Sequence, residues 1–209
     1  MEILKNFIVF EGADGSGTTT QIEKLRKSLE SIPPPFGFYN TFEPTDGPIG
    51  RLIRSALKNE ITLNAETIAR LFAADRNEHL FGQEGITLRC GRGELVICDR
   101  YTPSSYVYQG ITCGEALPCL LNSGFPGPEL LFFLDIDPGT AQKRMKTRAQ
   151  REIYEFLDFQ IQVRERYLAL IPKLRAEGIQ VEVIDASQTA DEIAGELWGL
   201  MQKMPIFNM

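Results

Sequence analysis

A glycine-rich segment, Gly12-Ala-Asp-Gly-Ser-Gly17, is the feature that most constrains how this chain folds. It follows an apolar, β-rich run at residues 7–11 and leads into a helix-length segment at residues 19–30. Glycines let a backbone curl closely around a ligand, and the free N–H groups at the start of a helix attract anions. A strand, such a loop and a helix in this order predict a phosphate-binding P-loop rather than a plain glycine-rich turn. The expected phosphate-binding residues are Gly12, Ala13, Asp14, Gly15, Ser16, Gly17, Thr18 and Thr19.

The two threonines that close this loop have different consequences. Thr19 stands where the pattern G-x-x-x-x-G-K-[ST] has the hydroxyl that holds Mg²⁺. Thr18 stands at the lysine position and brings a hydroxyl but no charge. Loss of a comparable cation from a phosphoryl-transfer site costs about 10³-fold or more in rate. Either another cation takes its place, or the protein binds nucleotide and transfers phosphate poorly.

The rest of the chain alternates short apolar runs with helix-length segments, which predicts a doubly wound α/β fold. The apolar runs are nearly continuous in hydrophobicity, as in parallel strands that are covered on both faces. We therefore expect a mostly five-stranded parallel sheet with helices on both faces and ligands at the carboxyl ends of its strands. Strands are expected at residues 7–11, 36–41, 94–98, 129–135 and 181–184. Helices are expected at residues 19–30, 49–58, 65–81, 138–148, 152–177 and 189–204.

Length and composition narrow the function classes. A chain of 209 residues fits one domain, and its net charge of -6 argues against nonspecific nucleic-acid binding. No apolar stretch approaches the roughly 20 residues that cross a bilayer, and no signal peptide is evident, so we expect no membrane partner and a cytoplasmic location. The spacing of Cys90, Cys98, Cys113 and Cys119 favours reduced thiols over a metal site, with Cys98 in a core strand. The single histidine, His79, is expected on a helix surface.

Six segments of the chain together resemble the thymidylate kinase family. Each segment alone is a weak signal, but their order and spacing are specific and cover most of the chain. The resemblance implies a P-loop nucleoside monophosphate kinase that uses ATP and Mg²⁺ to phosphorylate thymidine monophosphate (dTMP), and it suggests a homodimer. The segments are residues 7–21, 41–50 (TFEPTDGPIG), 71–76 (LFAADR), 99–109 (DRYTPSSYVYQ), 133–138 (FLDIDP) and 184–187 (IDAS).

The same resemblance implies roles for residues on the acceptor side. Phe72 and Arg76 share a helix face, so the ring would stack on a pyrimidine while the guanidinium donates to its O4. Arg100 is implied to bind the acceptor phosphate, and Asp99 to organise Mg²⁺ and its water. Without the resemblance, Phe72 and Arg76 also fit a core phenylalanine beside a surface arginine. Asp99 and Arg100 likewise also fit a structural ion pair. The other implied acceptor contacts are Asp14 at the sugar 3′-hydroxyl, Glu43 in the Glu-Pro loop, Ser105 and Gln109 at the base, and Tyr108 beneath the sugar.

One departure from the family pattern concerns the Glu-Pro loop. Phe42 stands where family members often have an arginine that helps hold the acceptor phosphate. Arg54 is a candidate replacement, although Arg51 and Arg54 are equally well explained as solvated helix charges.

A second departure concerns the catalytic arginine, because Gly15 occupies the loop position where some members carry it. This points to a lid, which we expect at about residues 137–155. Arg144, Arg148 and Arg151 recur there at helical spacing, which by itself is typical of a solvated helix face. Within the resemblance, Arg148 and Arg151 are the expected catalytic arginines, together with Asp99 and Arg100, because guanidinium groups neutralise the charge that develops on a transferring phosphoryl group.

Two other functions compete with a dTMP kinase. Thr18 and Phe42 support a catalytically weak nucleotide-binding paralogue with a sensing or scaffolding role. A kinase for another small acceptor, such as a deoxynucleoside, is the third hypothesis. The otherwise complete set of acceptor residues favours the dTMP kinase.

Overall fold

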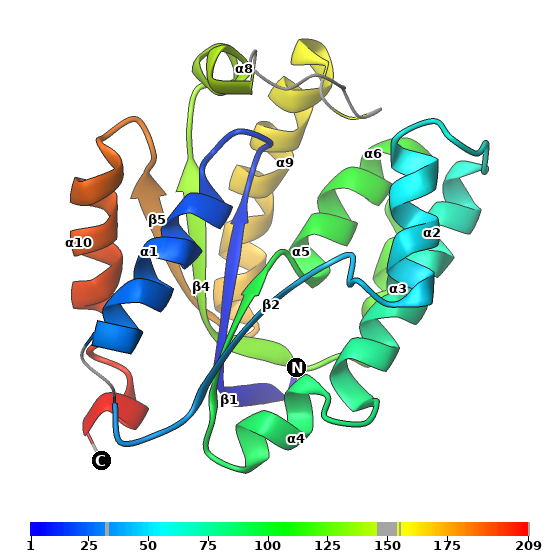
Figure 1. The fold of residues 1–209 in the computed structure, drawn as a ribbon. Coiled ribbons are helices and arrows are strands. Elements are labelled where there is room, and N and C mark those ends of the chain that lie inside the picture. Colours follow the sequence, from blue (N-terminus) through cyan, green and yellow to red (C-terminus); the bar gives the residue numbers. More distant parts are fainter. Residues whose placement is uncertain (32–33, 146–153, 155, 209) are drawn as a thin grey trace.

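The computed structural model describes residues 1–31, 34–145, 154 and 156–208. In this part of the chain, five parallel strands form one sheet in the order β2-β3-β1-β4-β5, with the first strand at its centre (Figure 1). Each expected strand overlaps an observed one, so the predicted doubly wound parallel sheet is confirmed. The strands are β1 (Ile3–Gly12), β2 (Phe38–Phe42), β3 (Leu95–Asp99), β4 (Gly127–Asp135) and β5 (Gln180–Asp185).

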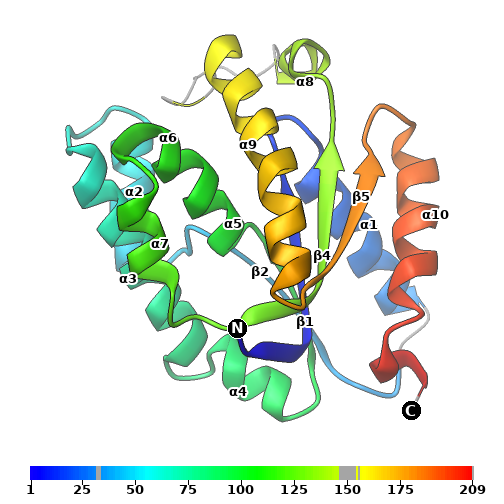
Figure 2. The same cartoon turned by 180° about the vertical axis from the view of Figure 1, so that it is seen from behind.

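Helices cover both faces of the sheet. Helices α1 and α10 lie on one face, while α3, α5 and α9 lie on the other (Figures 1 and 2). The short helices between residues 86 and 122 were not predicted, because each is too short to show a helical repeat of apolar residues. The helices are α1 (Thr18–Ser31), α2 (Pro48–Leu57), α3 (Ala65–Phe81), α4 (Ile86–Gly91), α5 (Thr102–Ser104), α6 (Gly110–Cys113), α7 (Ala116–Asn122), α8 (Pro138–Met145), α9 (Leu157–Ala176) and α10 (Ala190–Met201), with a π-helical turn at Ser105–Gln109 and a 3₁₀ turn at Pro205–Asn208.

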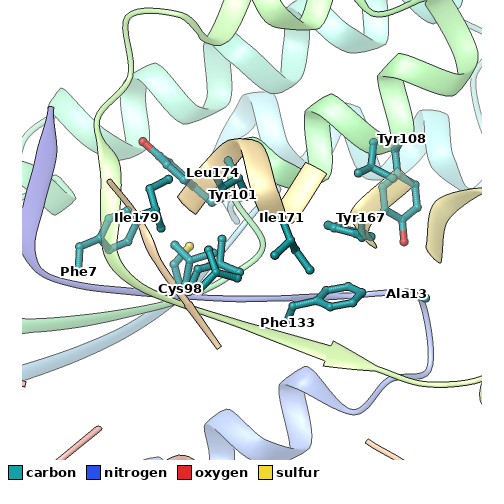
Figure 3. Close-up of a cluster of buried hydrophobic side chains, with 14 of the residues drawn as sticks. Phe7, Ala13, Cys98, Tyr101, Tyr108, Phe133, Tyr167, Ile171, Leu174 and Ile179 are labelled. Atoms are coloured by element: carbon teal, nitrogen blue, oxygen red, sulfur yellow. The ribbon is translucent and has the colours of Figure 1, made fainter. Parts of the chain in front are cut away.

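The central strand β1 is buried on both faces because its alternating side chains enter two different cores. Phe7 and Val9 pack in the cluster shown in Figure 3, which includes side chains from α9. Ile8 and Phe10 pack on the opposite face against α1 and α10. All four side chains are 0% exposed. Cys98 in β3 is also fully buried, as predicted.

The parallel register brings the polar strand ends to one edge of the sheet. Asp99 at the end of β3 pairs with Phe10 in β1 and with Phe42 in β2. Gly12, where the glycine-rich loop begins, pairs with Leu134 in β4. The loop, the segment after β3 and the segment after β2 therefore meet at the carboxyl edge, where ligands bind in such sheets. Among the described residues, no helix is both long and apolar enough to span a bilayer.

Candidate active site

The phosphate loop is shaped by glycines at positions that admit no other residue without strain. A Cβ atom on Gly12 would lie 2.9 Å from the carbonyl oxygen of Leu134, closer than real Cβ atoms come. Gly15 and Gly17 have φ values of 84° and 98°, in the left-handed region that glycine adopts at little cost. Helix α1 then begins at Thr18, so the N–H groups of its first turn face the loop.

The loop lines an open cavity of about 640 Å³. On its far side lie Arg144 from α8 and residues 188–190, and Arg144 Nη1 donates to the carbonyl oxygen of Ala186 at 3.0 Å. Among the described residues that line this cavity, the cations are Arg100 and Arg144. The cavity thus combines a backbone cradle for phosphate with few positive side chains, as expected from Thr18.

Thr19 and Asp99 form a site that fits Mg²⁺. The two residues are 80 positions apart in the chain, yet Thr19 Oγ1 donates to Asp99 Oδ2 at 2.7 Å. Asp99 Oδ1 is buried and has no hydrogen-bond partner among the described residues, which is costly unless a ligand supplies one. Carboxylate and hydroxyl oxygens are ligands that Mg²⁺ accepts. The structure therefore brings together the two residues that were expected to hold the metal.

Arg100 lies between the phosphate loop and a second cavity, the acceptor pocket described below. Its φ of 70° is unusual for a residue other than glycine, and its N–H donates to the carbonyl oxygen of Phe10 at 2.8 Å. The guanidinium is ion-paired with Asp14 Oδ1 and donates to Ser104 Oγ at 3.2 Å. One cation therefore faces both cavities.

Glu11 is a fully buried acid that organises the segment after β3. Its Oε1 accepts hydrogen bonds from the N–H groups of Tyr101 (2.9 Å) and Ser104 (3.2 Å). Its Oε2 accepts from the hydroxyls of Ser104 and Tyr167, both at 2.7 Å. Burial raises the pKa of Glu11, and the charge of Arg100 together with these hydrogen bonds offsets part of that rise. Ser104, Tyr167 and Glu11 were not among the expected site residues.

The acceptor pocket is a smaller cavity of about 110 Å³. Every residue expected on the acceptor side lines it except Ser105, which is buried behind Arg76 and accepts a hydrogen bond from Arg76 Nη1 at 3.1 Å. The lining residues are Asp14, Glu43, Pro44, Leu57, Phe72, Arg76, Arg100, Tyr101, Ser104, Tyr108, Gln109 and Tyr154.

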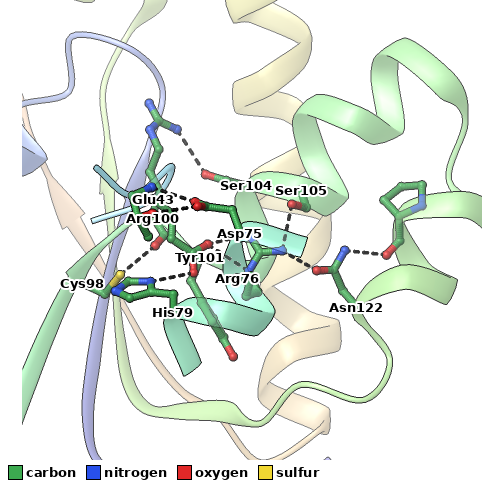
Figure 4. A network of polar contacts seen from close by, with 12 residues as sticks. Glu43, Asp75, Arg76, His79, Cys98, Arg100, Tyr101, Ser104, Ser105 and Asn122 are labelled. Atoms are coloured by element: carbon green, nitrogen blue, oxygen red, sulfur yellow. Dashed lines mark hydrogen bonds and ion pairs between the residues drawn. The ribbon is translucent and has the colours of Figure 1, made fainter. Parts of the chain in front are cut away.

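Arg76 is the most strongly bonded cation of this pocket, with 1% of its side chain exposed. Its Nε donates to Glu43 Oε2 at 2.9 Å, and Nη2 lies 2.7 Å from the same oxygen (Figure 4). Nη1 donates to both Ser105 and Asn122. Because Nη2 carries two hydrogens, one of them stays available for a ligand. Arg76 is therefore not the surface arginine that the sequence alone also allowed.

His79 lies one turn beyond Arg76 on α3 and faces inward, so the expected surface position is wrong. Its side chain is 9% exposed. Nε2 lies 2.6 Å from Thr41 Oγ1, and Nδ1 lies 3.1 Å from Glu43 Oε1. The inner face of α3 is polar at this point because it packs on the end of β2 and on the Glu-Pro loop.

Aromatic side chains form another wall of the acceptor pocket. The ring of Tyr108 lies 5.4 Å from that of Tyr154 between centroids, and the Arg100 guanidinium lies 5.1 Å from the Tyr108 centroid. Tyr154 in turn stacks on Phe159 at 5.0 Å with an interplanar angle of 11°. Burial raises the pKa of Tyr108 far above its usual value, so its hydroxyl stays protonated.

Gln160 on α9 fixes Asp14 of the phosphate loop. The N–H of Asp14 donates to Gln160 Oε1 at 3.0 Å, and Gln160 Nε2 donates to Asp14 Oδ2 at 2.7 Å. Nε2 also donates to the carbonyl oxygen of Tyr154 at 2.7 Å. Asp14 is thus held between Gln160 and Arg100, at the boundary of the two cavities. No motif in the sequence pointed to Gln160.

Comparison with known proteins assigns this arrangement to one family. A family model described as thymidylate kinase matches residues 10–196. The chain belongs to the thymidylate kinase family. It is 38% identical over 196 residues to a putative thymidylate kinase of Treponema pallidum, covering 92% of this chain and 93% of that protein. It is 39% identical over 203 residues to a probable thymidylate kinase of Pyrobaculum aerophilum, covering 97% and 99%, and 36% identical over 202 residues to one of Methanocaldococcus jannaschii, covering 95% and 97%.

In this thymidylate kinase family member, Arg54 braces the Glu-Pro loop. Arg54 Nη1 donates to the carbonyl oxygen of Thr45 at 2.5 Å, and Nη2 donates to that of Pro44. Asp75 on α3 holds the same loop by accepting from the N–H and the hydroxyl of Thr45, both at 2.7 Å. Arg54 lies 5.3 Å from the centroid of the exposed Phe42 ring. Arg54 is therefore not a freely solvated charge, and it is not among the residues that line the acceptor pocket.

The expected lid is described only in part. Arg144 is in α8 and lines the phosphate-loop cavity, and Tyr154 lines the acceptor pocket. Arg148 and Arg151, the expected catalytic arginines, lie outside the described residues.

Proposed function

We propose that this protein transfers the γ-phosphoryl group of ATP to dTMP and produces ADP and dTDP, the precursor of dTTP. The observation that carries the proposal is the position of Arg100, whose guanidinium faces both the phosphate-loop cavity and the acceptor pocket. A transfer between two bound phosphates needs such a shared boundary, where the reacting groups meet. Membership of the thymidylate kinase family supports this reaction and its donor.

The donor side binds phosphate mainly through backbone N–H groups. The loop from Gly12 to Thr19 would enclose the β- and γ-phosphates at the start of α1. Thr19 and Asp99 would hold Mg²⁺, which when bound neutralises charge on the donor phosphates. Asp99 already aligns the Thr19 hydroxyl at 2.7 Å, so this part of the site needs little rearrangement.

The acceptor side would recognise thymine and deoxyribose through side chains. Phe72 lines the pocket where a base would stack, and Arg76 Nη2 keeps a donor for the base O4. Gln109 also lines the pocket, where its side-chain amide would contact the edge of the base. Tyr108 and Asp14 would meet the sugar, where the Tyr108 ring excludes a 2′-hydroxyl. Ser105 would act through Arg76, to which it is hydrogen-bonded.

Catalysis would come from positioning and charge neutralisation, without a covalent intermediate. Arg100 would bind the acceptor phosphate while Asp14 holds its guanidinium. Arg148 and Arg151 would approach the transferring group from a lid at about residues 137–155 and supply the charge that Thr18 lacks. Exclusion of water by such a lid suppresses hydrolysis of ATP.

The remaining parts of the proposal concern organisation. We treat residues 1–209 as one domain that includes the lid, and the family resemblance favours a homodimer, which light scattering on purified protein would measure. Cys90, Cys98, Cys113 and Cys119 are free thiols, which is typical of a reducing compartment such as the cytoplasm.

A product assay tests the central reaction. Purified protein is incubated with MgATP and dTMP, and nucleotides are separated by chromatography; dTDP and ADP should appear in equal amounts. Reactions with dUMP and thymidine in place of dTMP separate a monophosphate kinase from a nucleoside kinase. Absence of dTDP, while calorimetry shows that dTMP binds, would overturn the proposed activity.

A further inference from the structure

A chain of hydrogen bonds links the single histidine of the protein to the side chain proposed to read the base. His79 is the one histidine in the sequence, and it lies between Thr41 Oγ1 at 2.6 Å and Glu43 Oε1 at 3.1 Å. The other carboxylate oxygen of Glu43 binds Arg76 at 2.9 Å (Nε) and 2.7 Å (Nη2). Figure 4 shows His79, Glu43 and Arg76 in this order.

The geometry selects one neutral form of the imidazole. A carboxylate oxygen accepts hydrogen bonds, so Nδ1 of His79 must carry the hydrogen that faces Glu43. Nε2 then presents its lone pair, which the Thr41 hydroxyl fills as a donor. The opposite tautomer would place the Nδ1 lone pair against a carboxylate oxygen. Glu43 therefore fixes the tautomer, and the hydroxyl of Thr41, which can donate or accept, satisfies the nitrogen that remains.

The carboxylate of Glu43 is in turn the group that orients Arg76. Oε2 of Glu43 accepts the hydrogen bonds from Arg76. When His79 holds Oε1, the carboxylate plane cannot rotate, and this fixes the direction of the Arg76 guanidinium. Ser105 and Asn122 hold Nη1 from the other side. The direction in which the remaining Nη2 hydrogen points thus depends on His79.

We propose that His79 is a positioning residue for base recognition: through Glu43 it aims Arg76 at the 4-position of the pyrimidine. The inference rests on the proposed function, because it assumes that Arg76 meets the base of the acceptor. Thymine presents an oxygen acceptor at position 4, whereas cytosine presents an amino donor. A correctly aimed Arg76 therefore favours dTMP over dCMP, and a misdirected one discriminates less.

Two variants of similar size separate this role from a packing role. His79→Asn keeps an N–H donor near the place of Nδ1, while His79→Leu has none. Calorimetric Kd values for dTMP and dCMP are measured for the wild type and both variants, with thermal unfolding as a check on folding. We expect His79→Leu to lower the dTMP preference at least about tenfold, the scale on which a misaligned hydrogen bond changes discrimination, and His79→Asn to keep it within about threefold. An unchanged preference in His79→Leu, or an equal loss in both variants, would overturn the inference.

A second measurement needs no substrate. In protein labelled with ¹⁵N-histidine, the single imidazole is observed directly, and the free protein should show the Nδ1–H tautomer. Thr41→Val, which removes the hydroxyl, should keep this tautomer, because Glu43 rather than Thr41 selects it. An Nε2–H tautomer in the wild type would contradict the inference. Because these readouts are tautomer and binding preference rather than turnover, they stay informative even if the assay for dTDP fails.

Discussion

The two halves of the site are built in opposite ways. The phosphate-loop cavity is formed mainly by the backbone of one continuous segment, and it is wide and weakly charged. The acceptor pocket is formed by side chains from α2, α3, α5, the π-helical turn and the segments that follow β1, β2 and β3. Several of these side chains are hydrogen-bonded to one another before any ligand binds. A backbone site tolerates exchange of a side chain such as the one at position 18. A site of interlocked side chains does not, because each group depends on the next.

The sharpest test of this contrast is removal of Arg76 from the acceptor network. Arg76→Met leaves Glu43 buried without its cation, and breaking a buried ion pair in this way costs about 3–5 kcal/mol in unfolding free energy. Arg70→Met on the same helix is the control, because Arg70 is 53% exposed where it pairs with Glu66 and such pairs contribute about 0.5 kcal/mol. Denaturant unfolding measures both; equal losses would show that the acceptor network is not interlocked.

On the donor side, the largest effect is expected from the backbone itself. Gly12→Ala places a methyl group against the carbonyl oxygen of Leu134, and such overpacking costs about 1–3 kcal/mol. The Km for ATP should rise because the loop must shift. Gly195→Ala in α10 is the control: its Cβ meets open space, so removal of a helical glycine should stabilise the protein by roughly 1 kcal/mol. A Gly12→Ala protein with unchanged stability and unchanged Km would mean that the loop is not tightly packed.

Exchange of the side chain at position 18 should have a smaller effect. Thr18→Lys adds a cation to a cavity whose described cations, Arg100 and Arg144, are already hydrogen-bonded to the protein. We expect kcat to rise about tenfold, which corresponds to about 1.4 kcal/mol, and Thr18→Met, of similar length, to give no rise. A gain near 10³-fold would mean that Arg148 and Arg151 do not supply the missing charge.

The smallest effect concerns Glu11, at the boundary between the two halves. Because its folded pKa is raised above 4.5, the folded state holds this proton more tightly than the unfolded state. Relative to Glu11→Gln, the wild type should therefore lose unfolding free energy as pH rises from about 4.5 through the raised pKa. Glu23 on α1 is the opposite case, since its hydrogen bond with Arg26 lowers its pKa to about 2. The contribution of Glu23 to the unfolding free energy should be present above pH 4.5 and be lost as pH falls toward 2. The contributions of Glu11 and Glu23 to the unfolding free energy should therefore change with pH in opposite directions.

The part of the site that could be predicted from the sequence is the part that depends on local order. The phosphate loop is contiguous, and Thr19 and Asp99 follow a loop and a strand whose ends the parallel register brings together. Arg76 shares a helix face with Phe72, but its place on the acceptor side was implied by the resemblance to the thymidylate kinase family, since the two residues alone also fit a core phenylalanine with a surface arginine. The positions of Thr19 and Asp99 required only the location of the loop and of the strand ends, whereas the roles of Asp99 and Arg76 were implied by the resemblance.

The remaining residues were missed because their partners are distant in the chain. Glu11 and Tyr167 are 156 positions apart, and no pattern connects them. Glu11 nevertheless left a signal, since an acid that ends an apolar strand is costly to bury unless it is fully hydrogen-bonded. The position of His79 was predicted wrongly for a related reason. A polar residue on a helix gives the same sequence pattern whether it faces solvent or packs against buried polar groups. Ser104 lines the pocket, whereas the expected residue was Ser105. A π-helical turn begins at Ser105, and the geometry of a regular helix does not predict the side-chain directions in such a turn.

The central place of β1 has a consequence for how the chain folds as it is made. Phe7 and Ile8 pair with Val96 and Leu130, so the most buried strand is synthesised first and its neighbours much later. At roughly 5–20 residues per second, several seconds pass before either neighbour exists. During that time an apolar strand with both edges unpaired is exposed, a state that favours aggregation. The strand that anchors the phosphate loop is therefore also a segment of the nascent chain that is prone to aggregation until its neighbours have been made.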